Sequence, residues 1–246
     1  MTLADILRPS CALFLDFDGT MVDIAPQPQA VLVPQPLIEA VRSLHGLLGG
    51  AVAVISGRPI AQIDGFLKPL QLPVAGVHGA ERRGVDGKMV LLHTHPLDRV
   101  EHAARALAAR HPGLIVETKR GSLALHYRQA PELEDECLQV MQAAVDASPG
   151  VTLLRGKMVA EAKPGGASKG RAIEEFLREP PFAGRTPVFI GDDVTDEAGF
   201  STVQRLGGIG IKVGEGATAA WRRLPNPSAL RSELEAAVAA RTPRTE

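Results

Sequence analysis

Aromatic side chains are scarce in this sequence: they make up 4% of the 246 residues, with one Trp and one Tyr. The core must therefore consist mainly of Val, Leu, Ile and Ala, within an apolar fraction of 45% that is ordinary for a globular protein. The two cysteines, Cys11 and Cys137, match neither a metal-ligand spacing nor a disulfide framework. This usage favours a reducing compartment.

Long apolar runs and blocks of like charge are also missing. No stretch approaches the roughly 18 apolar residues that a membrane-spanning helix needs. In the N-terminal segment, Asp5 and Arg8 interrupt any signal-peptide pattern. The formal net charge is −1 and no basic block occurs, which argues against nucleic acid or a membrane surface as a partner. We expect a cytoplasmic protein and, without a long apolar amphipathic helix, a monomer.

The chain contains an alternation of short apolar runs and helical patterns. Cys11–Asp16, Gly50–Ile55 and Val74–Val77 are predicted to be buried strands, and Pro34–Leu48 and Pro59–Leu67 have helical spacing behind a Pro. This order predicts a parallel sheet with crossover helices.

The middle of the chain has a different pattern, with hairpin signals at 81–93 and 114–128 and a strand or strand pair at 151–162. Two helices are predicted among these antiparallel strands, at 98–110 and 131–146. Strand–helix alternation resumes with a helix at Lys169–Leu177 and an apolar strand at Pro187–Gly191. We therefore predict an α/β protein with a Rossmann-like, doubly wound parallel-sheet core. The core is expected to comprise residues 1–82 and 161–246, and residues 83–160 an inserted α+β domain.

The strongest chemical signal is the segment Asp16-Phe17-Asp18-Gly19-Thr20 directly after the first strand. Ligands of parallel sheets bind at the carboxyl ends of strands, and Gly19 allows a sharp turn that brings both carboxylates to one site. Two such acids can act as nucleophile and as general acid and base. An isolated D-x-D could equally be an Asx turn that closes the strand. The full motif on a buried strand is far rarer and arises by chance in roughly one such chain in a thousand.

A second acidic cluster, Gly191–Glu197, follows another apolar strand. Four acids in six residues repel one another unless a cation compensates, and their hard oxygen ligands suit Mg²⁺. The alternative is an acidic helix N-terminus favoured by the helix dipole. The presence of the first motif favours the metal.

Two further segments offer anion-binding groups. Ser56-Gly57-Arg58-Pro59 combines a hydroxyl with a helix N-terminus, although Ser56 could be a plain N-cap. Before the helix at Lys169, glycines permit close approach to a phosphate, and either Lys163 or Lys169 could supply the charge or be a solvated surface lysine. The spacing is not that of a P-loop, and Gly207-Gly208-Ile209-Gly210 is not a dinucleotide fingerprint.

Together these motifs resemble the haloacid dehalogenase-like phosphatase superfamily, whose order of an aspartate pair, a serine, a lysine and an acidic loop they follow. More narrowly, the chain resembles the trehalose-6-phosphate phosphatases from Leu13 to about Trp221. The stretches that carry this resemblance are ISGR at 55–58, AGVHGAERR at 75–83, SLALHYRQAP at 122–131, EAKPGGASKG at 161–170 and GDDVTDE at 191–197.

The resemblance implies Mg²⁺-dependent hydrolysis of trehalose 6-phosphate, a small-molecule substrate, through an aspartyl-phosphate. Asp16 would be the nucleophile and Asp18 the general acid and base, with Ser56 and Lys169 binding the phosphoryl group. The implied metal-site residues are Asp16, Asp18 (through its carbonyl), Asp192, Asp193 and Asp196. The implied substrate-binding residues are Gly19, Thr20, Gly57, Arg58, His78, Glu117, Lys119, Glu161 and Lys163.

The insert would be a cap domain that grips sugar hydroxyls through Glu117, Lys119 and Glu161. Two of these residues have a simpler explanation, because Glu117 and Lys119 could form a solvated strand face. His78 could likewise be a structural histidine. Phosphatases of other sugar phosphates, a hexose-phosphate mutase and a non-catalytic sugar-phosphate sensor remain as alternatives. The sensor is disfavoured because both Asp16 and Asp18 are present.

Overall fold

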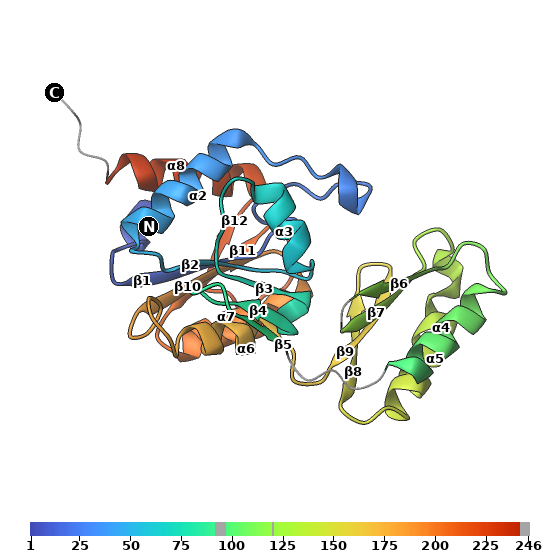
Figure 1. Ribbon diagram of the computed structural model, residues 1–246. Helices are drawn as coiled ribbons and strands as arrows, with labels where there is room; N and C mark the ends of the chain where they lie inside the picture. Colours follow the sequence, from blue (N-terminus) through green and yellow to red (C-terminus); the bar gives the residue numbers. More distant parts are fainter. Residues whose placement is uncertain (92–96, 120, 242–246) are drawn as a thin grey trace. The chain divides into compact units, whose positions relative to one another are not determined.

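The computed structural model describes residues 1–91, 97–119 and 121–241, except for the side chain of Lys119. The chain divides into two compact units, one formed by Met1–Met89 and Ser168–Glu246 and the other by Val90–Ala167. Figure 1 shows both units along the colour gradient of the chain. In the described part of the chain, no helix is both long and apolar enough to cross a membrane.

The first unit is built on a sheet with the strand order β12-β11-β10-β1-β2-β3-β4-β5. Its strands are β1 (Cys11–Leu15), β2 (Val52–Ile55), β3 (Val74–Gly76), β4 (Glu81–Arg83), β5 (Met89–Leu91), β10 (Thr186–Gly191), β11 (Ile209–Val213) and β12 (Arg222–Leu224). From β12 to β3 every pairing is parallel, whereas β4 pairs antiparallel with β3. The predicted α/β fold class is confirmed.

Helices cover both faces of this sheet (Figure 1). One layer holds α1 (Leu3–Ile6), α2 (Gln35–Leu47), α3 (Ile60–Leu67) and α8 (Pro227–Ala239), and the other holds α6 (Lys169–Phe176) and α7 (Glu197–Arg205). Successive side chains of β1 point to opposite faces of the sheet, so one strand contributes to both helix layers. Leu13 and Leu15 belong to the first core, whereas Phe14 stacks on Phe182 in the second, with 5.4 Å between the ring centroids.

The second unit has a four-stranded antiparallel sheet, β6-β7-β9-β8, with two helices. Its elements are α4 (Asp98–Ala108), β6 (Ile115–Lys119), β7 (Ser122–His126), the 3₁₀ turn η3 (Pro131–Leu133), α5 (Glu134–Asp146), β8 (Val151–Gly156) and β9 (Val159–Pro164). Leu123, Leu125 and Ala162 contribute to a core of its own, shared with residues of α4 and α5.

The bounds of the two units differ from those predicted from the sequence. Val74 pairs with Arg83, so β4 extends the sheet of the first unit instead of opening the insert. At the other junction β9 runs to Pro164, so residues 161–167 belong to the second unit. Two short elements, α1 and β12, were not predicted, because four and three residues carry too little periodicity.

Candidate active site

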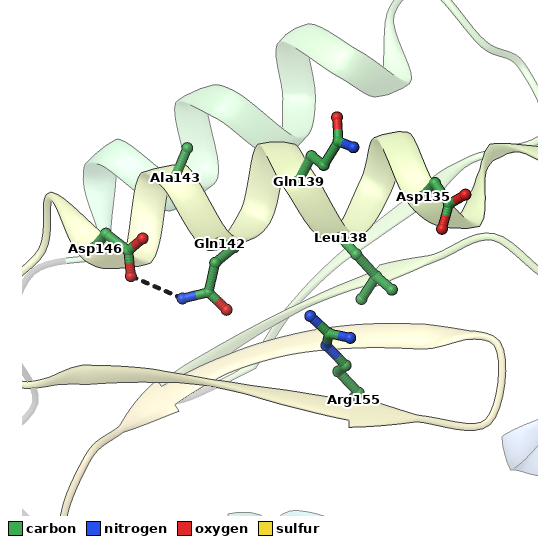
Figure 2. Close-up of a pocket in the computed structure, with 7 residues that line it drawn as sticks. All are labelled: Asp135, Leu138, Gln139, Gln142, Ala143, Asp146 and Arg155. Atoms are coloured by element: carbon green, nitrogen blue, oxygen red, sulfur yellow. Dashed lines mark hydrogen bonds between the residues drawn. The ribbon is translucent and has the colours of Figure 1, made fainter.

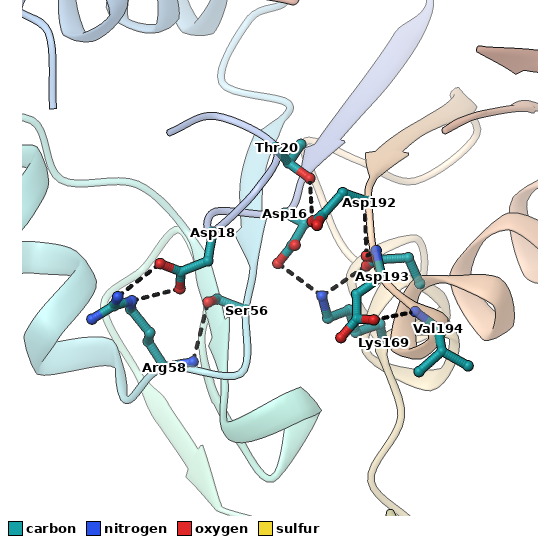
Figure 3. Close-up of polar contacts among 10 residues, drawn as sticks. Asp16, Asp18, Thr20, Ser56, Arg58, Lys169, Asp192, Asp193 and Val194 are labelled. Atoms are coloured by element: carbon teal, nitrogen blue, oxygen red, sulfur yellow. Dashed lines mark hydrogen bonds and ion pairs between the residues drawn. The ribbon is translucent and has the colours of Figure 1, made fainter. Parts of the chain in front are cut away.

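Three of the predicted site residues in the first unit follow three adjacent strands. Asp16 comes directly after β1, Ser56 after β2 and Asp192 after β10, and β1 lies between the other two strands. Parallel strands end at one edge of the sheet, so the order β10-β1-β2 places these residues side by side. Figure 3 shows Asp16 between Asp192 and the loop that carries Ser56.

Three carboxylates meet at this edge. Asp16, Asp192 and Asp196 each offer an oxygen within 4.8 Å of the others. Burial, together with repulsion from Asp196 and Asp192, raises the pKa of Asp16 well above its ordinary value despite the charge of Lys169. Burial and Asp196 likewise raise the pKa of Asp192 to about 6. Clustered carboxylates with raised pKa values and hard oxygen donors fit a divalent cation.

Asp196 is fully buried and acts as the anchor of the acidic loop. Its Oδ2 accepts hydrogen bonds from the main-chain N–H groups of Asp192, at 3.0 Å, and Asp193, at 2.8 Å. The carboxylate of Asp193 instead caps the 3₁₀ turn η4 (Val194–Asp196), accepting from the N–H of Val194 at 2.7 Å (Figure 3). The hydrogen bonds therefore show that Asp196 and Asp193 order the acidic loop.

The ammonium group of Lys169 bridges the carboxylates of Asp16 and Asp196. Lys169 is the first residue of α6, 3% exposed, and its ammonium lies 2.8 Å from Asp16 Oδ1 and 2.7 Å from Asp196 Oδ1. Burial alone would lower the pKa of Lys169, but the charges and hydrogen bonds of the two aspartates outweigh it and raise the pKa. Lys169 is thus a fixed cation beside Asp16.

The side chain of Asp18 points toward Arg58 (Figure 3). Arg58 Nε donates to Asp18 Oδ2 at 2.6 Å and Nη2 donates to Oδ1 at 2.7 Å, a bidentate pair. The guanidinium also lies over the rings of Phe17 and Phe66, and it donates to the carbonyl of Pro28 in the 3₁₀ turn η1 (Pro28–Ala30) and to Gln62. Arg58, expected from the resemblance to touch substrate, is therefore engaged with Asp18.

Gly19 and Thr20 contact Asp192. Gly19 has φ +75°, and a Cβ there would collide with the Asp192 carboxylate, so both backbone conformation and space require glycine. Thr20 Oγ1 donates to Asp192 Oδ1 at 3.0 Å. These residues shape the acidic site from the β1 side.

Ser56 and Gly57 line the neighbouring loop with His78. The Ser56 hydroxyl, 1% exposed, accepts a hydrogen bond from the N–H of Arg58 at 3.1 Å. A Cβ at Gly57 would stand 2.7 Å from Cε1 of His78, so the imidazole packs directly on this glycine. His78 lies in the 3₁₀ turn η2 (Val77–Gly79), and its φ is +54°.

The remaining predicted residues lie in the second unit. Ala124 pairs with Glu117 on one side and with Glu161 on the other, which places both glutamates on the sheet face opposite Leu123 and Leu125. His126 Nε2 lies 2.9 Å from Glu117 Oε2, and Ser122 Oγ donates to Glu161 Oε1 at 2.7 Å. Lys163 Nζ donates to the carbonyl of Ala167 at 2.6 Å. The side chain of Lys119 lies outside the described part.

A separate groove of about 460 Å³ lies between α5 and β8 of the second unit (Figure 2). Its walls include Asp135, Gln142 and Arg155, and it contains none of the predicted site residues. Asp146 accepts from Gln142 there at 2.7 Å.

Two features of the site were missed from the sequence. The Arg58–Asp18 pair joins residues 40 positions apart, which no local spacing reveals. Lys212 donates to the main-chain carbonyl of Asp192. A signal for Lys212 did exist, because it is the only charge in the apolar segment 208–213 and a buried strand seldom carries an isolated lysine.

The sequence is similar to those of known proteins. The family model described as trehalose-phosphatase matches residues 14–227. The trehalose-6-phosphate phosphatase of Escherichia coli (strain K12) is 45% identical over 219 residues, covering 88% of this chain and 82% of that protein. A probable trehalose-phosphate phosphatase of Sinorhizobium fredii is 43% identical, covering 92% of this chain and 86% of the other.

The fold is also found in solved structures. The C-terminal domain of trehalose-6-phosphate phosphatase from C. albicans superposes with a TM-score of 0.85 at 21% identity, covering 96% of this chain and 93% of the other. The resemblance predicted from the motifs is thereby confirmed, and the chain belongs to the trehalose-phosphatase family.

Proposed function

We propose that this protein hydrolyses trehalose 6-phosphate to trehalose and inorganic phosphate, using Mg²⁺ and an aspartyl-phosphate on Asp16. The observation that carries the proposal is the buried Asp16, which lies 2.8 Å from the Lys169 ammonium and belongs to a group of three carboxylates. A nucleophilic carboxylate beside a fixed cation is suited to attack on a phosphoryl group. The names of the family and of its relatives support the choice of substrate.

In the first step, an Asp16 oxygen attacks phosphorus in line as the bond from phosphorus to the sugar oxygen breaks. For this step Asp18 must carry a proton on one carboxyl oxygen while the other keeps a hydrogen bond from Arg58. It gives that proton to the departing oxygen, so that free trehalose leaves. In the second step, Asp18 takes a proton from water, whose oxygen attacks the same phosphorus. The P–O bond to Asp16 breaks, and this releases phosphate and restores the Asp16 carboxylate.

Charge compensation is the main requirement of such a transfer. Lys169 provides one positive charge, and Ser56 could hold a phosphoryl oxygen with its hydroxyl. Asp16 and Asp192 would hold Mg²⁺, with the carbonyl of Asp18 completing the protein ligands. When bound, Mg²⁺ neutralises charge on the phosphoryl oxygens.

Recognition of the sugar is assigned to the second unit. The polar face of its sheet presents Glu117 and Glu161, and carboxylates held by Ser122 and His126 can accept hydrogen bonds from hydroxyl groups. A site built to hydrogen-bond hydroxyls rejects analogues that leave its polar groups unpaired.

We propose that the enzyme works as a monomer in the cytoplasm, which sedimentation and cell fractionation would test.

The proposal is tested by phosphate release from trehalose 6-phosphate with Mg²⁺ and with EDTA, beside sucrose 6-phosphate, glucose 6-phosphate and mannose 6-phosphate. We expect Mg²⁺-dependent release with a strong preference for trehalose 6-phosphate. Preference for another sugar phosphate would overturn the substrate but keep the chemistry. Absence of release from all four, with the protein folded, would favour a mutase or a sensor.

The nucleophile is tested separately by Asp16→Asn. We expect the variant to lose turnover while keeping its circular dichroism spectrum, because an amide cannot form the covalent intermediate. Asp23→Asn, at a residue whose carboxylate pairs with Arg231 away from the acidic cluster, is the matched control. Substantial turnover by Asp16→Asn would remove Asp16 from this role.

A further inference from the structure

Lys212 is a buried lysine that has no role in the proposed reaction. It lies in β11 and is 5% exposed, although lysines are almost never fully buried unless they are paired. No ion pair of Lys212 occurs among the residues that the structure describes. Burial of an ammonium group is costly, so its position calls for a specific partner.

That partner is the main chain of the acidic loop. In the parallel pairing of β10 with β11, Lys212 stands opposite Gly191, the residue before Asp192. From there its ammonium donates a hydrogen bond to the carbonyl oxygen of Asp192. The contact is with a peptide oxygen and leaves the carboxylate of Asp192 free to face Asp16.

Asp192 is consequently held at three points. Its N–H donates to Asp196 Oδ2 at 3.0 Å, its side-chain Oδ1 accepts from Thr20 at 3.0 Å, and its carbonyl accepts from Lys212. These contacts fix the peptide on both sides of the Cα and the direction of the side chain. Mg²⁺ demands near-ideal octahedral geometry, so a carboxylate fixed in this way is a better ligand than a mobile one.

We propose that Lys212 is a positioning residue that sets the affinity of the metal site by fixing the Asp192 peptide; this inference rests on the proposed function. Loss of a partner that orients a metal ligand typically weakens binding by about 10- to 100-fold. The charge of Lys212 acts in the opposite direction, because a nearby cation repels Mg²⁺. The positioning effect is expected to prevail because the ammonium bonds to a peptide that carries a ligand.

The test compares Lys212→Met, which removes donor and charge, with Lys212→Gln, which removes the charge but keeps an N–H donor. Mg²⁺ dissociation constants are measured by calorimetry on the full chain, without substrate, and the KM for Mg²⁺ and kcat are measured with trehalose 6-phosphate. Lys88→Met, at an exposed lysine of the same unit, is the matched control. Thermal midpoints in EDTA report on folding.

We expect Lys212→Met to weaken Mg²⁺ binding about tenfold or more, with kcat at saturating Mg²⁺ within a few-fold of the wild type, and Lys212→Gln to retain tighter binding than Lys212→Met. Equal tightening in both variants would show that the charge dominates and overturn the inference. A lower midpoint in EDTA with unchanged affinity would reduce Lys212 to a stability role. If the wild type itself neither binds Mg²⁺ nor releases phosphate, the proposed function fails and this inference with it.

Discussion

The bidentate pair of Arg58 and Asp18 holds the expected acid and base of the reaction in one orientation. Arg58 is itself fixed by two aromatic rings, the carbonyl of Pro28 and Gln62. A planar guanidinium with several simultaneous contacts cannot be replaced by the single point charge of lysine. The function of Arg58 is therefore expected to depend on its shape as well as on its charge.

This leads to a prediction for Arg58→Ala. Hydrolysis of trehalose 6-phosphate should fall by about 10²- to 10⁴-fold, the range for a displaced general acid and base. With 2,4-dinitrophenyl phosphate, whose leaving group needs no proton, phosphorylation of Asp16 should stay fast while the second step is slow. Rapid-mixing absorbance should then show a burst of dinitrophenolate close to the enzyme concentration.

The control for this prediction is Gln62→Ala, which removes a single contact of Arg58 and should stay within a few-fold of the wild type. Arg58→Lys should hydrolyse trehalose 6-phosphate only slightly faster than Arg58→Ala, because lysine cannot form the bidentate pair with Asp18. If Arg58→Ala instead raises KM for both substrates and shows no burst, Arg58 is a substrate-binding residue, as the sequence resemblance implied.

The raised pKa of Asp192 predicts a pH dependence of metal binding. In the metal-free protein its pKa is about 6, so the carboxyl carries a proton below that pH and a cation must displace it. The affinity for Mg²⁺ should fall by up to about tenfold per pH unit as the pH drops below 6. Calorimetric titrations from about pH 5 to pH 8 would measure this, and a flat profile would contradict it.

Much of the site at this scale was predictable from the sequence. The motifs named Asp16 and Asp192, because their positions after parallel strands force them to the same end of the sheet. They also named Lys169, because glycines precede it at the start of a helix. The orientation of Asp18 and Arg58 was not predictable, since a side chain chooses its partner from groups brought together only by the folded chain. The division of labour among Asp192, Asp193 and Asp196 likewise depends on loop hydrogen bonds.

At the scale of the elements, Tyr127 follows β7 and is the single tyrosine of the chain. The ionisation of its phenol can therefore be followed by absorbance. Burial, and then its hydrogen bond to Glu134 at 2.9 Å, raise the pKa of its phenol to about 12. A raised phenol pKa stabilises the fold while the pH is below the unfolded value of about 10. This contribution is lost as the pH rises through the folded value.

We predict that the phenolate absorbance of the folded protein appears near pH 12, and that of the protein in denaturant near pH 10. Glu134→Gln should lower the folded value because it removes a negative charge that opposes phenolate formation. Tyr127→Phe should abolish the absorbance change. Titration of the folded protein near pH 10 would mean that Tyr127 is accessible to solvent.

The long elements were predicted well and the short ones poorly. The helix expected at Pro34–Leu48 is α2, and the strand expected at Pro187–Gly191 is β10, because their apolar patterns extend over enough residues. At the edge of the sheet, β4 holds only three residues, too few for their pattern to show that they pair antiparallel with the nearby β3. The sequence therefore placed the start of the insert near residue 83, whereas the second compact unit begins at Val90.

At the scale of the whole molecule, the two separate hydrophobic cores predict that the second unit can fold without the first. The second unit has its own cluster around Leu125, Met141 and Ala162, contributed only by residues 97–162. A fragment of residues 90–167 should therefore unfold cooperatively and have no phosphatase activity. Circular dichroism melting would measure this, and a non-cooperative transition would show that the unit needs the rest of the chain.

The central position of β1 has a consequence for synthesis on the ribosome. One edge of β1 pairs with β2, which follows shortly, but the other edge pairs with β10, which is made only after the whole second unit. At about 5–20 residues per second, that edge waits on the order of ten to thirty seconds with unpaired main-chain groups. During this interval the nascent first unit is an open half-sheet, and we expect it to be the stage at which the chain depends most on chaperones.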